Sequence, residues 1–143
     1  MPATTVETIS EVEALVRDFE SCALGRELWT HAAHLKVALW YLLHHGWDEA
    51  VGLTRLGIKR YNAASGVADT PTGGYHETLT VFWLHTVRRF LESRGDEAHA
   101  PDELARRLVA SADKNLPLEF YTRARLMSPE ARAAWVAPDL KPL

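Results

Sequence analysis

The stretch "WTHAAHLKVALWYLLHHG", residues 29–46, decides the fold because it predicts a helix that is buried on almost every side. Thr30 is a good N-cap residue, and Gly46 stands where glycine commonly ends a helix, so we expect this helix to cover residues 31–45. Its apolar residues surround the axis instead of forming one stripe, which is typical of the central helix of a bundle. His31 and His34 begin the helix, where burial is about to become complete.

The rest of the chain also carries helical patterns. Apolar residues recur at helical spacing between capping signals, such as the capping box that Ser10 forms with Glu13. Gly52 and Gly57 each weaken a helix by about 1 kcal/mol relative to alanine, which lowers the intrinsic helix propensity of the third helix. The expected helices cover residues 10–21, 31–45, 48–64, 75–93 and 102–113.

The C-terminal part has one more start signal, Ser128 followed by Pro129, which predicts a short helix before an extended tail. No strand alternation and no internal repeat is found. A chain of 143 residues with 47% hydrophobic side chains fills one core, whereas two domains would each be too small. The sequence therefore predicts an all-α fold, a single domain over residues 1–143. It is a bundle of four to five antiparallel helices plus the short helix and the tail.

Charge and composition exclude several kinds of partner. Lys and Arg number 16 against 19 for Asp and Glu, and the basic residues are scattered. This distribution argues against nucleic acid and against an anionic membrane surface as the partner. No apolar stretch approaches the roughly 20 residues that span a bilayer. Because Cys22 is the only cysteine and "MPATTVETIS" does not have the pattern of a signal peptide, we expect a cytoplasmic protein.

The expected topology brings polar residues from three segments to one end of the bundle. The helices at 31–45 and 48–64 are each about 25 Å long and are joined by a very short link. The second helix therefore returns to the level where the first begins, and the loop 66–74 keeps the next helix start at that end. The polar residues expected there are His31, His34, Tyr61, Asn62, Tyr75, His76, Glu77 and Thr80.

Three of these residues, His31, His34 and His76, predict a metal site. Imidazoles three residues apart lie on adjacent turns of one helix face, and a third from a neighbouring helix completes a set with open positions. Neutral imidazole suits zinc, iron or copper. The H-x-x-H spacing alone is weak in a chain with seven histidines, and a helix cap or a core histidine is the alternative. We interpret the remaining histidines as structural or solvated: His44, His45, His85 and His99.

Three functions are open at this end of the bundle. The first is a metal-dependent enzyme that acts on a small metabolite, with Glu77 transferring the proton of a metal-bound water and Tyr75 as a further catalytic candidate. The second uses two histidines and a carboxylate in an iron or copper oxygenase. The third is a non-catalytic sensor or accessory protein that binds a small molecule without a metal. The candidate substrate contacts are Tyr61, Asn62, Thr80 and Tyr121.

Two other segments carry weaker signals. The loop "GVADTPTGG", residues 66–74, either presents backbone N–H groups to a carboxylate or phosphate or is a tight turn before a helix. In the tail, we expect Leu126 and Trp135 to hold the C-terminal segment on the bundle, with an arginine paired to Asp139. If exposed, Trp47 and Trp135 would instead serve a homodimer interface.

Four segments carry a resemblance: "WTHAAHL" at 29–35, "RYN" at 60–62, "TGGYHETLT" at 72–80 and "YTRARLMSPEARAAWVAPDL" at 121–140. The chain resembles a family of small, largely uncharacterised bacterial proteins in which a W-T-H-x-x-H-L segment precedes a Y-H-E-T-x-T segment. The resemblance covers roughly residues 15–143 and implies no reaction. It implies that six of the candidate residues are motif positions: His31, His34, Asn62, Tyr75, His76 and Glu77.

Overall fold

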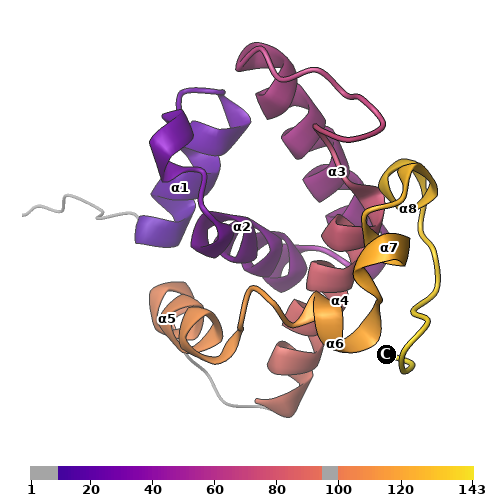
Figure 1. Cartoon of the computed structure of the whole chain (residues 1–143). Helices are drawn as coiled ribbons and strands as arrows, with labels where there is room; N and C mark the ends of the chain where they lie inside the picture. Colours follow the sequence, from indigo (N-terminus) through magenta and orange to yellow (C-terminus); the bar gives the residue numbers. More distant parts are fainter. Residues whose placement is uncertain (1–9, 95–99) are drawn as a thin grey trace, which may run out of the picture.

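A computed structural model describes residues 10–94 and 100–143 of the chain. Four short helices accompany five longer ones in this described part: η1 (Arg26–Leu28), α6 (Pro117–Phe120), α7 (Arg123–Leu126) and α8 (Pro129–Ala133). The longer helices, shown in Figure 1, are α1 (Glu11–Glu20), α2 (His31–His44), α3 (Trp47–Ala64), α4 (Glu77–Ser93) and α5 (Pro101–Ser111). Each predicted bound of these five lies within two residues of the observed one.

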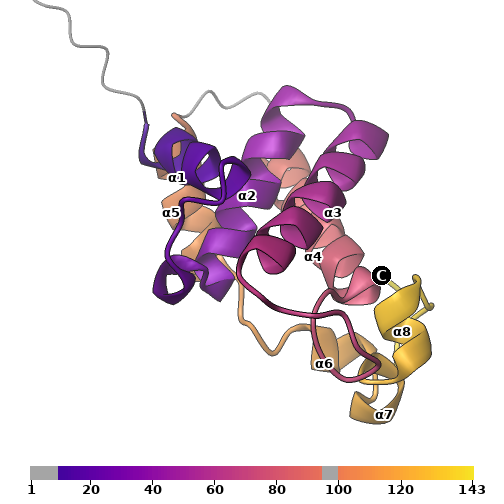
Figure 2. The same ribbon diagram turned by 90° about the horizontal axis from the view of Figure 1, so that it is seen from above.

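Helix α2 is the centre of the fold. It contacts α1, α3, α4 and α5, with α1 and α5 on one side of it and α3 and α4 on the other (Figures 1 and 2). Leu35, Val37 and Leu39 on α2 are all at most 1% exposed. The prediction of a central buried helix is therefore confirmed, because an apolar surface around the whole axis is satisfied only by neighbours on several sides.

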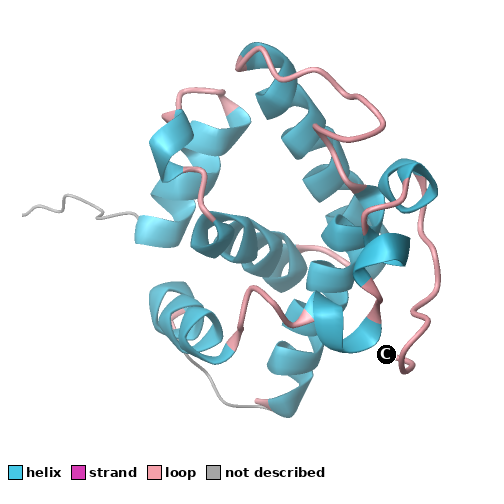
Figure 3. Cartoon of the chain, viewed as in Figure 1, coloured by secondary structure: helices cyan, strands magenta, loops and turns pink. Residues whose placement is uncertain are grey.

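No β-strand occurs in the part of the chain that is described, where Thr70 and Gly73 form one isolated bridge (Figure 3). The all-α prediction is confirmed. Within the same residues, none of the helices has the length and hydropathy that crossing a bilayer would require.

The helix caps follow the predicted residues with one correction. The hydroxyl of Ser10 accepts from the backbone N–H of Glu13, and the hydroxyl of Thr30 accepts from that of Ala33. Gly46 does not end α2 in a left-handed conformation. It has φ −69° and is the N-cap of α3, while the extended backbone of His45 ends α2.

The start of α4 is the boundary that matters most for the site. Helix α4 begins at Glu77, whereas the sequence predicted a helix from residue 75. His76 is the N-cap residue in an extended conformation, and Tyr75 lies in the preceding loop. Of the neighbours His76 and Glu77, only Glu77 is therefore helical.

The C-terminal segment packs on α4 through a second apolar cluster around Phe82, Tyr121 and Leu126. The predicted helix after Ser128 is observed as α8, with the Ser128 hydroxyl accepting from the N–H of Ala131. The tail is tied to α4 by Thr78, whose hydroxyl donates to the carbonyl of Ala134 and accepts from the N–H of Val136.

The expected roles of Leu126, Trp135 and Asp139 are met in part. Leu126 is buried, and the Trp135 ring contacts Tyr121 although Trp135 stays 39% exposed. Asp139 pairs with no arginine in the described structure: its carboxylate accepts two hydrogen bonds from Thr122 instead. The backbone N–H and hydroxyl of Thr122 lie close enough to use both carboxylate oxygens.

Candidate functional site

A cavity of about 510 Å³ lies among the start of α2, the end of α3, the start of α4 and the C-terminal segment. Residues from segments far apart in the sequence meet there, as the topology predicted. Six of the predicted polar residues line this cavity: His31, His34, Asn62, Tyr75, His76 and Thr80.

The other lining residues were not selected from the sequence. Aromatic and aliphatic side chains form most of the wall, with Trp29 and Trp83 the largest. Two arginines, Arg26 and Arg132, also line it, and no Asp or Glu is found among the described lining residues. Arg132 lies in the C-terminal segment that carries the resemblance, which was the available signal, but its place at the cavity depends on how α8 packs.

His31 and His34 lie close together at the start of α2. The Nδ1 of His34 donates to the carbonyl of Thr30 at 2.7 Å, and its ring stacks on Trp29 with 3.8 Å between centroids. The His31 ring meets Trp83 edge to face, and its Nε2 is buried with no hydrogen-bond partner among the described residues. Burial lowers the pKa of both rings below the ordinary 6.5, so both are neutral at pH 7.

His76 has a structural role in this arrangement. It is 7% exposed, its Nδ1 accepts from the N–H of Leu79 at 3.1 Å, and its Nε2 donates to the carbonyl of Leu126 at 2.7 Å. Burial lowers the pKa of His76, which keeps the neutral form that both hydrogen bonds need. The ring therefore caps α4 and joins it to α7.

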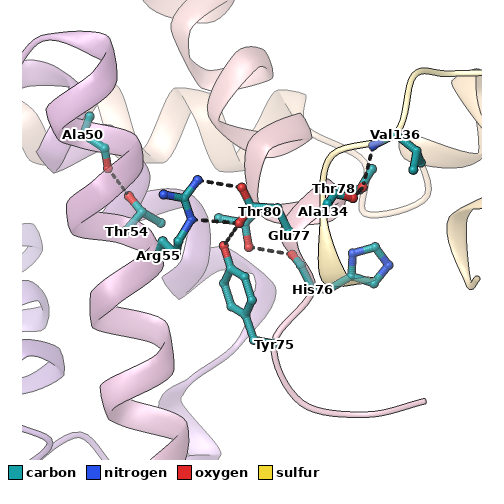
Figure 4. Close-up of polar contacts among 10 residues, drawn as sticks. All are labelled: Ala50, Thr54, Arg55, Tyr75, His76, Glu77, Thr78, Thr80, Ala134 and Val136. Carbon is teal, nitrogen blue, oxygen red and sulfur yellow. Dashed lines mark hydrogen bonds and ion pairs between the residues drawn. The ribbon is translucent and has the colours of Figure 1, made fainter. Parts of the chain in front are cut away.

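Glu77 belongs to a separate polar network, drawn in Figure 4. Its carboxylate accepts from Nε and Nη2 of Arg55 at 2.9 and 2.6 Å and from the Tyr75 hydroxyl at 2.6 Å. The His76 ring points away from this network, toward the C-terminal segment (Figure 4). The Arg55 guanidinium lowers the pKa of Glu77, and burial raises the pKa of Tyr75.

This network does not favour the expected acid–base role of Glu77. Glu77 does not line the cavity, and a carboxylate that holds three hydrogen bonds with a lowered pKa is a weak base. The arrangement instead fixes the ring of Tyr75, which does line the cavity. The geometry thus favours Glu77 as a positioning residue.

Two tyrosines expected to contact substrate lie away from the cavity. Tyr61 is 1% exposed and donates its hydroxyl to the carbonyl of Leu24. Tyr121 is fully buried and donates to the carbonyl of Val136. Neither lines the cavity, which corrects the expectation for both. Each hydroxyl finds a backbone acceptor in the core, as buried tyrosines usually do.

The loop before α4 is a turn that shapes the cavity. Asp69 Oδ1 accepts from the N–H of Tyr75, and Gly74 has a left-handed φ of +86°. A Cβ at Gly74 would lie 2.7 Å from the carbonyl oxygen of Ala68, so only glycine fits there. The carbonyl of Gly74 in turn accepts from Nη1 of Arg132. At the start of α4, the N–H of Leu79 is capped by the His76 ring and is not open to an anion.

The remaining histidines have local partners. His44 contacts the Trp40 ring, His45 pairs with Glu49, and His85 lies against Trp47. His99 is outside the described residues.

No group of three or more His, Cys, Asp or Glu side chains in the described ranges is arranged to hold a metal ion. The physical reason is visible at His76, whose two ring nitrogens are both engaged by backbone groups. Binding a metal there would require one of these hydrogen bonds to break. The metal site with its zinc, iron or copper ion stays a prediction.

Comparison of the chain with protein-family models, with curated proteins and with solved structures finds no match. The family resemblance therefore stays a prediction, and we infer the function from the residues that line the cavity.

Proposed function

We propose that this protein binds a small organic molecule in the cavity between α2, α3, α4 and α8. The observation that carries the proposal is a cavity of about 510 Å³ with two buried nitrogen atoms, His31 Nε2 and Arg132 Nε, that have no described partner. Ligand pockets commonly have volumes of about 300–1,000 Å³. A buried polar atom without a partner costs about 1–3 kcal/mol, and a bound polar group that these side chains can reach removes that cost.

The lining fits a ligand with an apolar body and a few polar groups. Trp29 and Trp83 contribute aromatic surface to the wall, and apolar side chains from α2 and α4 continue it. The side-chain amide of Asn62, which no described residue engages, can both donate and accept. Sites of this kind combine a mainly apolar surface with a small number of placed polar groups.

Dye binding tests the proposal. We expect 8-anilinonaphthalene-1-sulfonate or the neutral dye 6-propionyl-2-dimethylaminonaphthalene to bind saturably, one per chain, with a blue shift of its emission. Asn62→Trp fills the cavity and should raise the Kd at least about tenfold. Ala63→Trp is the matched control, because Ala63 is exposed on the same helix and does not line the cavity.

Two results separate failure of the proposal from failure of the variant. If circular dichroism shows that Asn62→Trp is unfolded, Val67→Trp blocks the same cavity from the loop. The proposal is rejected if neither dye binds the wild type saturably. It is also rejected if the cavity variant Asn62→Trp and the control Ala63→Trp bind the dye equally well.

A metal-dependent enzyme is the second candidate, and the arrangement of His31 and His34 favours it. Both rings line the cavity, both are neutral at pH 7, and Nε2 of His31 is unpartnered. Two imidazoles would bind one zinc, iron or copper ion, with water or substrate in the remaining positions. The oxygenase form of this candidate needs Glu77 as a ligand, which requires its release from Arg55.

Metal analysis distinguishes the two candidates. The enzyme candidate expects one zinc, iron or copper ion per purified chain, lost in His31→Ala and retained in His44→Ala. If isothermal titration of the wild type with zinc, iron and copper shows no binding, the enzyme candidate is rejected. The ligand-binding proposal is unaffected by that result.

A cytoplasmic location and a homodimer belong to the same proposal. The location is supported by Cys22 being the only cysteine of the chain. The exposed Trp135 is the support for a dimer contact, whereas Trp47 is half-buried under the guanidinium of Arg88. Sedimentation velocity of the wild type and Trp135→Ala tests the dimer.

A further inference from the structure

We infer that the ligand is an organic monocarboxylate with an aromatic or aliphatic body, and that the guanidinium of Arg132 contacts its carboxylate. This inference rests on the proposed small-molecule function and names the chemical class of the molecule. Three observations carry it: the state of Arg132, the distribution of charge around the cavity, and the apolar walls.

Arg132 lines the cavity and, unlike the three arginines that pair with a glutamate, has no carboxylate partner in the described structure. Arg17, Arg55 and Arg107 are each within 2.9 Å of a glutamate oxygen. Arg132 is half-buried, donates one hydrogen bond from Nη1 to the carbonyl of Gly74 at 3.1 Å, and forms no ion pair within the described ranges. A guanidinium held in place with its charge unmatched suits a bidentate carboxylate from outside the chain.

The charged side chains that line the cavity in the described part of the chain are both basic. The described lining contains Arg26 and Arg132 but no Asp or Glu. The carboxylate of Glu77, at the start of α4, accepts two hydrogen bonds from Arg55 and is neutralised by it. A neutral or cationic ligand would leave the charge of Arg132 uncompensated in a partly desolvated place.

The amount of charge favours a monoanion. Burial holds the pKa of each lining histidine below its ordinary value, so the histidines add no positive charge at pH 7. One half-buried guanidinium and one exposed arginine match the single charge of a carboxylate better than the nearly double charge of a phosphate monoester.

The walls define the rest of the molecule. Two indole rings, Trp29 and Trp83, line the cavity with aliphatic side chains such as Ile58 and Leu79. A planar aromatic ring or a branched aliphatic chain fills such a space by burying apolar surface.

A pair of probes of nearly equal shape tests the inference. We expect 2-naphthoate to bind the wild type about 10- to 100-fold more tightly than 2-naphthamide by isothermal titration, the range expected for one charge-assisted interaction. Arg132→Gln should remove this preference by weakening 2-naphthoate about 10- to 100-fold and changing 2-naphthamide less than about threefold. Arg132→Lys, which keeps the charge and loses the fork, should fall between.

The controls keep the outcomes separate. Arg123→Gln removes an exposed arginine of the same C-terminal segment that does not line the cavity, and it should bind both probes like the wild type. The amide also reports on folding, since a variant that loses its fold loses both probes. Equal affinity of the wild type for both probes overturns the inference, as does tighter binding of 2-naphthyl phosphate than of 2-naphthoate. If the wild type binds neither the naphthalene probes nor the dyes, the proposed function itself is overturned.

Discussion

His76→Ala should destabilise the fold, although the sequence predicted this residue as a metal ligand. The substitution removes the acceptor for the N–H of Leu79, and loss of an N-cap side chain costs about 0.5–2 kcal/mol. It also leaves the buried carbonyl of Leu126 without its donor, which costs about 1–3 kcal/mol. We therefore expect the free energy of unfolding to fall by about 2–4 kcal/mol.

Urea unfolding followed by circular dichroism measures this change. With a slope near 2 kcal/mol per molar urea, the midpoint should fall by about 1–2 M. His76→Asn keeps a good cap acceptor but does not reach Leu126, so it should lose less stability than His76→Ala, by about 1 kcal/mol. His44→Ala is the control, because His44 is exposed and its loss should change the free energy by less than about 0.5 kcal/mol.

The reasoning is refuted if His76→Ala unfolds within about 0.5 kcal/mol of the wild type, a change typical of surface substitutions. Equal stability of the alanine and asparagine variants would show that the cap contributes nothing. A His76→Ala variant as stable as the wild type would mean that the His76 ring is free to bind another group, which would strengthen the metal candidate.

Three further predictions use the same unfolding measurement. Gly52→Ala should stabilise α3 by up to about 1 kcal/mol, because the added Cβ meets no other atom. Gly57→Ala should destabilise the protein by about 1–3 kcal/mol, because the added Cβ would lie 2.6 Å from the Phe19 ring; equal effects of the two changes would contradict this contact. The cavity histidines have lowered pKa values, so below about pH 6.5 the unfolded chain binds more protons than the folded chain. The free energy of unfolding should therefore be full above that pH and fall toward about pH 5, and a free energy that does not change over this range would contradict the prediction. Glu77→Gln weakens the partly buried ion pair with Arg55 and should lower the free energy of unfolding by about 1–3 kcal/mol. A loss below about 0.5 kcal/mol would contradict this and show that solvent screens the pair.

The helices could be predicted because their signals are local. A hydroxyl at Ser10 or Thr30 accepts from an N–H three residues on, and the apolar periodicity that follows requires burial on a known face. The convergence at the cavity also followed from local facts, since a short link between two helices of similar length returns the chain to its starting level. His31, His34, Asn62 and the start of α4 met for that reason.

The roles of the side chains could not be predicted in the same way. Tyr61 stands next to Asn62 in the sequence, yet one faces the core and donates to Leu24 while the other lines the cavity. A two-residue difference in where α4 begins turned His76 from a helical residue into a cap. The direction of a side chain depends on the register of each helix against its neighbours, which local pattern leaves free.

By itself the sequence determined the helical class, the central place of residues 31–44 and the end of the bundle where the polar residues gather. These follow from burial of apolar surface and from backbone hydrogen bonds that close within a few residues. Only the tertiary structure decided that Glu77 pairs with Arg55, that His76 bonds to Leu126, and that Arg132 reaches the cavity without a carboxylate. Each of these depends on contacts between atoms 22 to 58 residues apart, where packing chooses among many partners of similar chemistry.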